Sequence, residues 1–137
     1  MTNAARKSAA ASSLDQDWAL ERAPFIDAAE SLANRIISAV ASADAKACAA
    51  CYTEDAVIFA PGDIPVTGQA EILKYFESVI AQHTVISTVF TMRAEADGRI
   101  GYLIQATVAS TGNSTVVRMM RLTEEGVWRI CAETVAA

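Results

Sequence analysis

Histidine and cysteine are scarce in this sequence, which also has no long apolar run and no block of basic residues. The 137 residues include one histidine and three cysteines. Tetrahedral zinc takes four nitrogen or sulfur ligands, and too few occur near one another here, so we expect no metal and no organic cofactor. A membrane helix needs roughly 20 apolar residues in a row. The formal net charge of −5 disfavours phosphate backbones. We therefore expect neither a membrane nor a nucleic-acid partner.

The cysteines themselves allow two interpretations. Cys48 and Cys51, in the segment CAAC, have the spacing of a redox motif or of half a zinc site. They also lie in an alanine-rich stretch with helical character, where small apolar cysteines at i and i+3 are common in cores, and this favours packing. Together with Cys131 they are expected to be unpaired thiols. With no secretory signal in the sequence, they indicate a cytoplasmic protein.

Apolar residues are abundant instead, at 53% of the chain with a mean hydropathy of +0.26. A chain of this length is expected to form one domain that buries about two-thirds of its unfolded surface. The apolar excess indicates a well-filled core, an apolar pocket or an interface between subunits. Residues 1–14 are small and polar, and we expect them to be a disordered tail ahead of a domain at 15–137.

Helices are predicted in the first half of the chain. Helical character starts at Asp15, and Pro24 suits the first turn of a second helical segment. Its apolar residues recur at helical spacing: Phe25, Ala29, Leu32, Ile36 and Val40. Asp44 can cap a short helix that runs through Tyr52. A third helix begins near Gly68 and turns Ile72, Phe76, Val79 and Ile80 to one side.

Strands dominate the second half. A first strand is predicted in AVIFA, which ends at Pro61, because proline cannot donate to a ladder. Four more are predicted at 85–94, 99–110, 114–123 and 127–135, separated by glycine-containing turns. Three helices followed by an antiparallel meander indicate an α+β domain with the helices on one face of the sheet.

The segments YTEDAVIFAP, VTGQAEI and EEGVWRI, in this order, carry a family resemblance. Over about residues 24–135 the chain resembles the nuclear transport factor 2-like superfamily, and within it the SnoaL-like and ketosteroid isomerase-like domains. The resemblance implies a cystatin-like α+β roll, a cone whose curved antiparallel sheet carries the helices on its concave face. It implies a single SnoaL-like domain, an apolar cavity that holds a small apolar or amphipathic molecule, and a homodimer.

The resemblance also locates positions where relatives carry catalytic groups. The tyrosine, the base and the late acid of the ketosteroid isomerases fall at Ile36, Ala60 and about Arg118, so that mechanism is not expected. Limonene epoxide hydrolase-like members use an Asp–Arg–Asp set. Arg118 and Glu133 could form part of one, but Met120 occupies the position of the paired aspartate.

Three charged residues are candidates for chemistry. Arg118 and Arg121 are three apart on one strand, so one should point inward, where it needs a carboxylate or an anionic ligand; a snorkelling edge arginine is the alternative. For Glu133, alternation from Trp128 places it outside with Ile130 inside, whereas the family register turns Cys131, Glu133 and Val135 inward, and we favour the latter. Asp63 follows Pro-Gly and could face the entrance, or could simply stabilise its turn.

Two functions remain open from the sequence. Glu133 or Asp63 could move a proton and Arg118 could stabilise an oxyanion, in an isomerase, cyclase or dehydratase acting on an apolar ketone- or polyketide-like substrate. Alternatively, the domain could bind a ligand or associate without catalysis. The residues expected to contact a ligand are Ile36, Val40, Tyr52, Phe59, Phe76, Tyr102, Met120 and Cys131.

Overall fold

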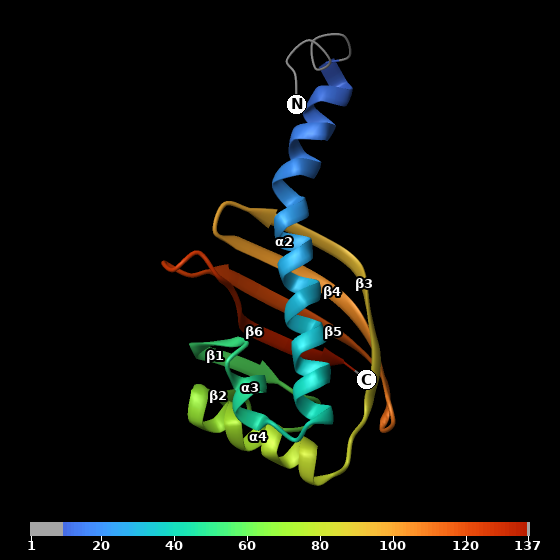
Figure 1. Ribbon diagram of the computed structural model, residues 1–137, viewed down its shortest axis with the longest axis vertical. Coiled ribbons are helices and arrows are strands. Elements are labelled where there is room, and N and C mark those ends of the chain that lie inside the picture. The colour runs from blue at the N-terminus through green and yellow to red at the C-terminus, as the bar shows by residue number, and fades with distance from the viewer. Residues whose placement is uncertain (1–9, 137) are drawn as a thin grey trace.

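The computed structural model describes residues 10–136 and contains three helices in this range, as predicted (Figure 1). Helix α2 spans Ala10–Ala41 and crosses one face of the sheet, while α3 at Ala45–Ala49 and α4 at Gln69–Ala81 lie beside its C-terminal end. Within the described residues, no helix has the combination of length and apolar character that crossing a membrane requires.

Six strands form one curved sheet in the order β2-β1-β6-β5-β4-β3. Their bounds are Tyr52–Phe59 for β1, Val66–Thr67 for β2, Ile86–Asp97 for β3, Ile100–Ala109 for β4, Gly112–Leu122 for β5 and Trp128–Ala136 for β6. The meander from β3 to β6 is antiparallel, as predicted. The prediction of a fully antiparallel sheet was wrong for one pair of strands, because β1 and β6 are parallel. The connection through α4 starts β3 antiparallel to β1, and three hairpin reversals then return β6 to the direction of β1.

Helix α2 is continuous where the sequence predicted a new helix. Pro24 lies inside it, exposed, although an interior proline removes one backbone hydrogen bond. The apolar stripe that follows is buried against the sheet, from Phe25 through Leu32 to Ile36, and this burial stabilises the helix despite the proline. Of the predicted tail, residues 1–9 lie outside the described residues and 10–14 form the first turns of α2.

The short helix α3 ends earlier than predicted. Asp44 caps its start by accepting a hydrogen bond from the Ala47 amide at 3.1 Å. The helix ends at Ala49, and Tyr52 is already the first residue of β1, beside β6. Burial of the aromatic ring between sheet and helices outweighs the helical tendency of the alanine-rich segment. This change of boundary directs the Tyr52 side chain into the interior.

The core lies between α2 and the concave face of the sheet. At one end the Phe25 ring packs edge-on against Trp128, with ring centroids 4.9 Å apart. Phe25 also lies directly over Gly101 of β4, where a Cβ would be 2.5 Å from a ring carbon. A glycine at this position therefore lets the helix approach the sheet, and the other end of the concave face is left to form a cavity.

Candidate functional site

An inner cavity of about 420 Å³ opens between the C-terminal half of α2, helix α4 and the concave side of the sheet. Its apolar lining comes from both helices and from β3, β5 and β6: Ile36, Phe76, Val79, Ile86, Val116 and Val135. Three polar residues, Tyr52, Arg118 and Glu133, line it at positions that are themselves buried. We call these three the floor of the cavity.

The floor belongs to a hydrogen-bonded network that also includes Gln105 and Thr91 and so spans five strands. Arg118 Nε donates to Glu133 Oε1 at 2.7 Å, and the Tyr52 hydroxyl donates to the same oxygen at 2.8 Å. Arg118 Nη1 donates to Gln105 Oε1, and Gln105 Nε2 donates to Thr91 Oγ1 at 3.1 Å. Buried charges need such partners, because an unpaired ion in an apolar interior is strongly unfavourable. The network therefore fixes the orientation of the guanidinium and the carboxylate.

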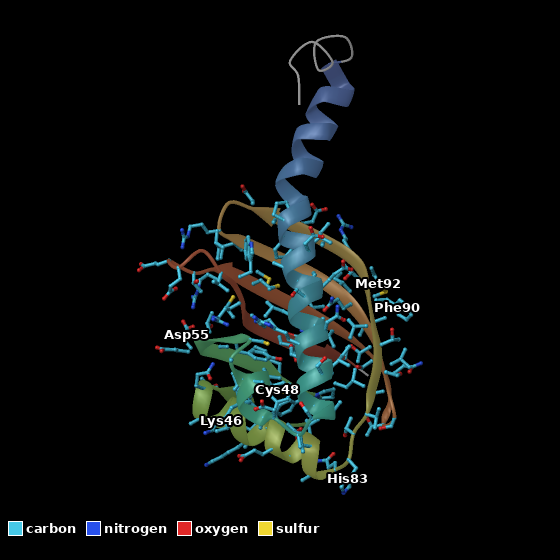
Figure 2. All side chains as sticks on the ribbon, in the orientation of Figure 1. Lys46, Cys48, Asp55, His83, Phe90 and Met92 are labelled. Atoms are coloured by element: carbon cyan, nitrogen blue, oxygen red, sulfur yellow. The ribbon has the colours of Figure 1, made fainter. Side chains whose placement is uncertain are left out.

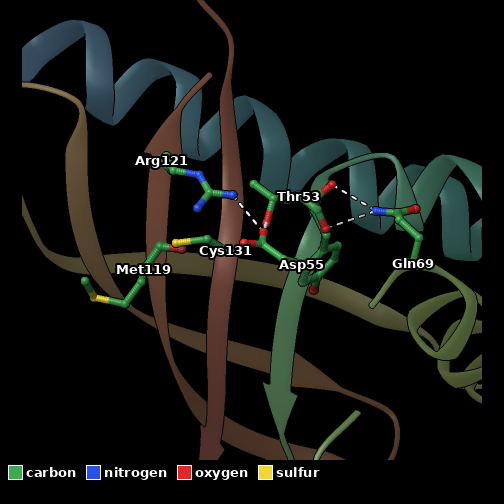
Figure 3. Close-up of polar contacts among 7 residues, drawn as sticks. Thr53, Asp55, Gln69, Met119, Arg121 and Cys131 are labelled. Atoms are coloured by element: carbon green, nitrogen blue, oxygen red, sulfur yellow. Dashed lines mark hydrogen bonds and ion pairs between the residues drawn. The ribbon is translucent and has the colours of Figure 1, made fainter. Parts of the chain in front are cut away.

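The two arginines of β5 lie on opposite faces, which confirms the prediction from their spacing. Arg118 is buried, paired with a carboxylate as the sequence required of an inward arginine. Arg121 lies on the outer, convex face and pairs with Asp55 of β1 at 2.7 Å (Figure 3). Asp55 also accepts a hydrogen bond from Thr53 at 2.8 Å. The outer pair is solvent-exposed and belongs to the surface.

A β-bulge in β6 explains why two conflicting registers were predicted for this strand. The pairing with β5 shifts by one residue, and Cys131 is the extra residue. Alternation is therefore interrupted, and both Ile130 and Glu133 point inward. The predicted inward position of Glu133 was correct, but that of Cys131 was wrong. Cys131 donates to the Met119 carbonyl at 3.4 Å on the outer side (Figure 3).

The tyrosine of the floor is held in place by its backbone as well as by its hydroxyl. Gln69, at the start of α4, reaches β1 with its side chain (Figure 3). Its Nε2 donates to the Tyr52 carbonyl at 3.0 Å and to the Ala49 carbonyl at 2.9 Å. One side chain thus joins α3, β1 and α4 at the point where the chain enters the sheet.

The floor sets the protonation of its own groups. Burial first, and then the Glu133 carboxylate, raise the pKa of Tyr52 well above its ordinary value. Burial disfavours a charge on Arg118, but the Glu133 carboxylate and the Tyr52 side chain together outweigh burial and raise the pKa of the arginine. Tyr75 of α4 has a raised pKa because of burial, followed by Glu133 and Asp63. At neutral pH the floor thus contains a charged arginine and a protonated tyrosine.

The cavity brings together six of the residues singled out from the sequence: Ile36, Tyr52, Asp63, Phe76, Arg118 and Glu133. Ile36, Ala60 and Arg118, which the sequence resemblance matched to catalytic positions of ketosteroid isomerases, all line it. Tyr75 also lines the cavity and was missed. Its spacing of three from Ile72 and four from Val79 would have placed it on the inward face of α4.

Five predicted contact residues do not line this cavity. Val40 and Met120 are buried in the core itself. Phe59 is exposed and pairs with the outward Thr134 of β6. Tyr102 and Cys131 also lie on the convex side, because strand alternation and the β6 bulge turn them away from the helices. Periodicity alone did not say which of the two apolar faces of the sheet encloses the cavity.

The cysteines and the surface groove beside α2 do not resemble this cavity. Cys48 and Cys51 are both buried, and burial, with smaller contributions from Cys51 and Asp44, raises the pKa of Cys48 to about 11, as expected of packed thiols. Among the described residues, no three histidine, cysteine, aspartate or glutamate side chains are grouped as a metal site. A surface groove of about 630 Å³ between α2 and α3 is larger than the inner cavity, but its arginines, Arg35 and Arg129, are not buried.

Comparison with known proteins agrees with this architecture. A family model described as a SnoaL-like domain matches residues 33–129. A search of curated proteins found no match. Among solved structures, a domain of unknown function with a cystatin-like fold from Nostoc punctiforme aligns with a TM-score of 0.73 and 12% identity, over 83% of this chain and 77% of that one.

Two further structures are similar at comparable levels. A ketosteroid isomerase-like protein from Erwinia carotovora atroseptica aligns with a TM-score of 0.64 and 19% identity, over 80% of this chain and 92% of that one. A nuclear transport factor 2-like protein with a cystatin-like fold from Novosphingobium aromaticivorans aligns with a TM-score of 0.67 and 18% identity, over 82% of this chain and 83% of that one. At these identities the likeness shows the fold alone, and function must be argued from the site.

Proposed function

This chain belongs to the family of SnoaL-like domains, and from that premise we propose that its inner cavity binds a small apolar or amphipathic ketone and moves a proton on it. The reaction would be an isomerisation, a cyclisation or a dehydration that side chains alone carry out. Glu133 is the proton carrier and Arg118 stabilises the oxygen that becomes negative.

One observation carries this proposal: an ion pair with a protonated tyrosine at the floor of a cavity whose middle is apolar. Buried ion pairs contribute little net stability, and apolar residues of similar volume often serve a core as well or better. An arginine and a glutamate facing a cavity are therefore better explained by a ligand than by packing. Cavities of this size, apolar with a few convergent polar groups, are typical small-molecule sites.

The chemistry follows from the hydrogen-bond donors and acceptors of the floor that the network leaves unused. Among the described residues, both hydrogen bonds to Glu133 reach Oε1, so Oε2 can accept a proton from the carbon next to a bound carbonyl. A guanidinium has five N–H donors, of which Glu133 and Gln105 use two. Another can donate to the carbonyl oxygen as the enolate forms. Return of the same proton to a different carbon completes an isomerisation with no net change in charge.

Proton exchange tests this directly. The protein is incubated in D₂O with enones, polyketide-like aromatic ketones and steroid ketones, and NMR follows loss of the protons next to the carbonyl. Wild type should accelerate exchange on the ligand class that binds, and Glu133→Gln should lower that acceleration by about 10²–10⁴-fold while binding persists. Binding without accelerated exchange by wild type would refute proton transfer and leave a non-catalytic ligand-binding domain.

A second function, association with another copy, is supported by the convex face of the sheet. Large apolar residues are exposed there on three strands: Phe59, Phe90, Met92, Val117 and Met119. Figure 2 shows Phe90 and Met92 projecting outward from β3. Contiguous apolar patches of this kind mark interaction surfaces. A second copy of this chain would offer the same face and give a homodimer with a two-fold axis.

Sedimentation equilibrium tests this homodimer. Val117 lies on β5, between β4 and β6, so Val117→Lys should shift the equilibrium to monomer by placing a charge in the apolar interface. Ile64→Lys is the matched control, because Ile64 is as apolar but lies exposed in the loop between β1 and β2. A wild-type protein that is monomeric at micromolar concentration would refute the homodimer.

A further inference from the structure

The cavity has no unpaired positive charge to offer a ligand. Its lining includes one basic residue, Arg118, and two acidic ones, Asp63 and Glu133. The arginine is neutralised by Glu133 at 2.7 Å. One positive and two negative charges leave a formal charge of −1, located at Asp63 in the loop between β1 and β2. A carboxylate or phosphate on a ligand would meet this charge without a free cation to balance it.

The polar groups of the cavity form two separate zones. One is the buried floor. The other lies at the open end, where hydroxyl and amide side chains come from the end of α4, from the loop before β3, from β4 and β5 and from the turn between these two strands: Ser78, Gln82, Thr84, Thr107, Thr111 and Ser114. The apolar lining provided by Phe76, Val79 and Val116 separates the two zones. We call the second zone the mouth.

Two mouth hydroxyls are placed for a ligand. Thr107 of β4 and Ser114 of β5 are direct cross-strand partners, and both line the cavity. Within residues 10–136 neither hydroxyl takes part in a side-chain hydrogen bond, unlike Gln82, which donates to Ser78 at 3.1 Å. Directly opposed residues have Cβ atoms about 5 Å apart, so one ligand hydroxyl can reach both side chains.

We propose that the ligand is an uncharged molecule with two polar ends. Its carbonyl reaches Arg118 at the floor, a flat apolar body fills the middle of the cavity, and a hydroxyl at the far end binds Thr107 and Ser114. This inference rests on the proposed function, because it assumes that the floor receives a carbonyl. It adds the second polar end and the exclusion of acidic ligands.

Three matched ketones test the inference by isothermal titration calorimetry: 2-acetylnaphthalene, 6-acetyl-2-naphthol and 6-acetyl-2-naphthoic acid. Titrations at about pH 6 keep the naphthol neutral and the acid ionised. The naphthol should bind about 2–10-fold more tightly than the parent ketone, the effect of one or two hydrogen bonds. The acid should bind more weakly than the parent.

Paired variants locate the second polar end. Thr107→Val and Ser114→Ala should remove the difference in Kd between the naphthol and the parent ketone. Thr115→Val is the control, because Thr115 neighbours Ser114 in sequence but lies on the convex face, opposite Ala106. This inference is overturned, while the proposed function stands, if the parent binds but the naphthol binds no more tightly than the parent. It is also overturned if the acid binds as tightly as the parent. If none of the ketones binds, both fall.

Discussion

Two ion pairs whose arginines both lie on β5 provide a test of what burial does to a salt bridge. Arg118 Nε and Glu133 Oε1 are 2.7 Å apart, and so are Arg121 Nη2 and Asp55 Oδ1. Their side chains differ in exposure, at 9% and 5% for the inner pair against 42% and 70% for the outer pair. The N–O distance and the strand of the arginine are matched, and the two pairs differ most in their exposure to solvent.

For the inner pair we expect Glu133→Leu to lower the free energy of unfolding by about 3–5 kcal/mol, because it leaves a buried guanidinium without its carboxylate. Arg118→Met should cost a similar amount. The double variant should lose less than either single variant, because apolar residues then replace both ions and no uncompensated buried charge remains. The expected coupling energy is therefore at least about 3–5 kcal/mol.

For the outer pair we expect Asp55→Ala, Arg121→Ala and their double variant to give a coupling energy of about 0.2–1 kcal/mol, because water solvates both ions. Raising the salt concentration should weaken this coupling further and hardly affect the inner pair.

Urea unfolding at fixed protein concentration, followed by tryptophan fluorescence, gives all of these values. The reasoning is refuted if the inner coupling energy falls below about 1 kcal/mol or responds to salt as the outer one does. Either result would mean that water reaches the floor in solution and that the charges there are effectively exposed.

Three further predictions concern the core and the titrating groups. Gly101→Ala should lower the free energy of unfolding in urea by about 1–3 kcal/mol, because its Cβ would meet the Phe25 ring. Adding Phe25→Leu should relieve part of that loss, so the double variant should lose less than the sum of the two single variants. Additive losses would contradict this. Because the pKa of Tyr52 is raised in the folded protein, its contribution to stability is fully present below about pH 10 and is lost as the pH rises through the folded pKa. Tyr52→Phe should therefore reduce the fall of the urea midpoint at alkaline pH. A fall as steep as that of wild type would contradict this. The pKa of Cys48 is about 11, so few of these thiols are ionised in the folded protein at neutral pH. In a variant whose other two cysteines are serine, Cys48 should react with Ellman's reagent on the order of 100-fold more slowly in the folded than in the urea-unfolded protein. Equal rates would show that the thiol is accessible.

The sequence by itself determined the class of fold and much of the inner surface. The apolar stripe from Phe25 to Ile36 predicted the helix that covers the sheet, and the turn signals after Val85 predicted the meander. The spacing of Arg118 and Arg121 required one arginine to point inward. These features are local, because helical and strand periodicities place side chains relative to their own backbone without reference to the rest of the chain.

The tertiary structure decided which inward residues meet. The bulge at Cys131 turns Ile130 and Glu133 to the same side, which no regular alternation does, and only the pairing of β6 with β5 creates it. Helix α2 continues through Pro24 because the apolar residues that follow, from Phe25 to Ile36, are buried against the sheet. Both faces of the sheet carry apolar residues, so the pattern did not distinguish cavity from convex surface. The physical reason is that register, bulges and burial depend on contacts between strands distant in sequence, whereas periodicity describes one element at a time.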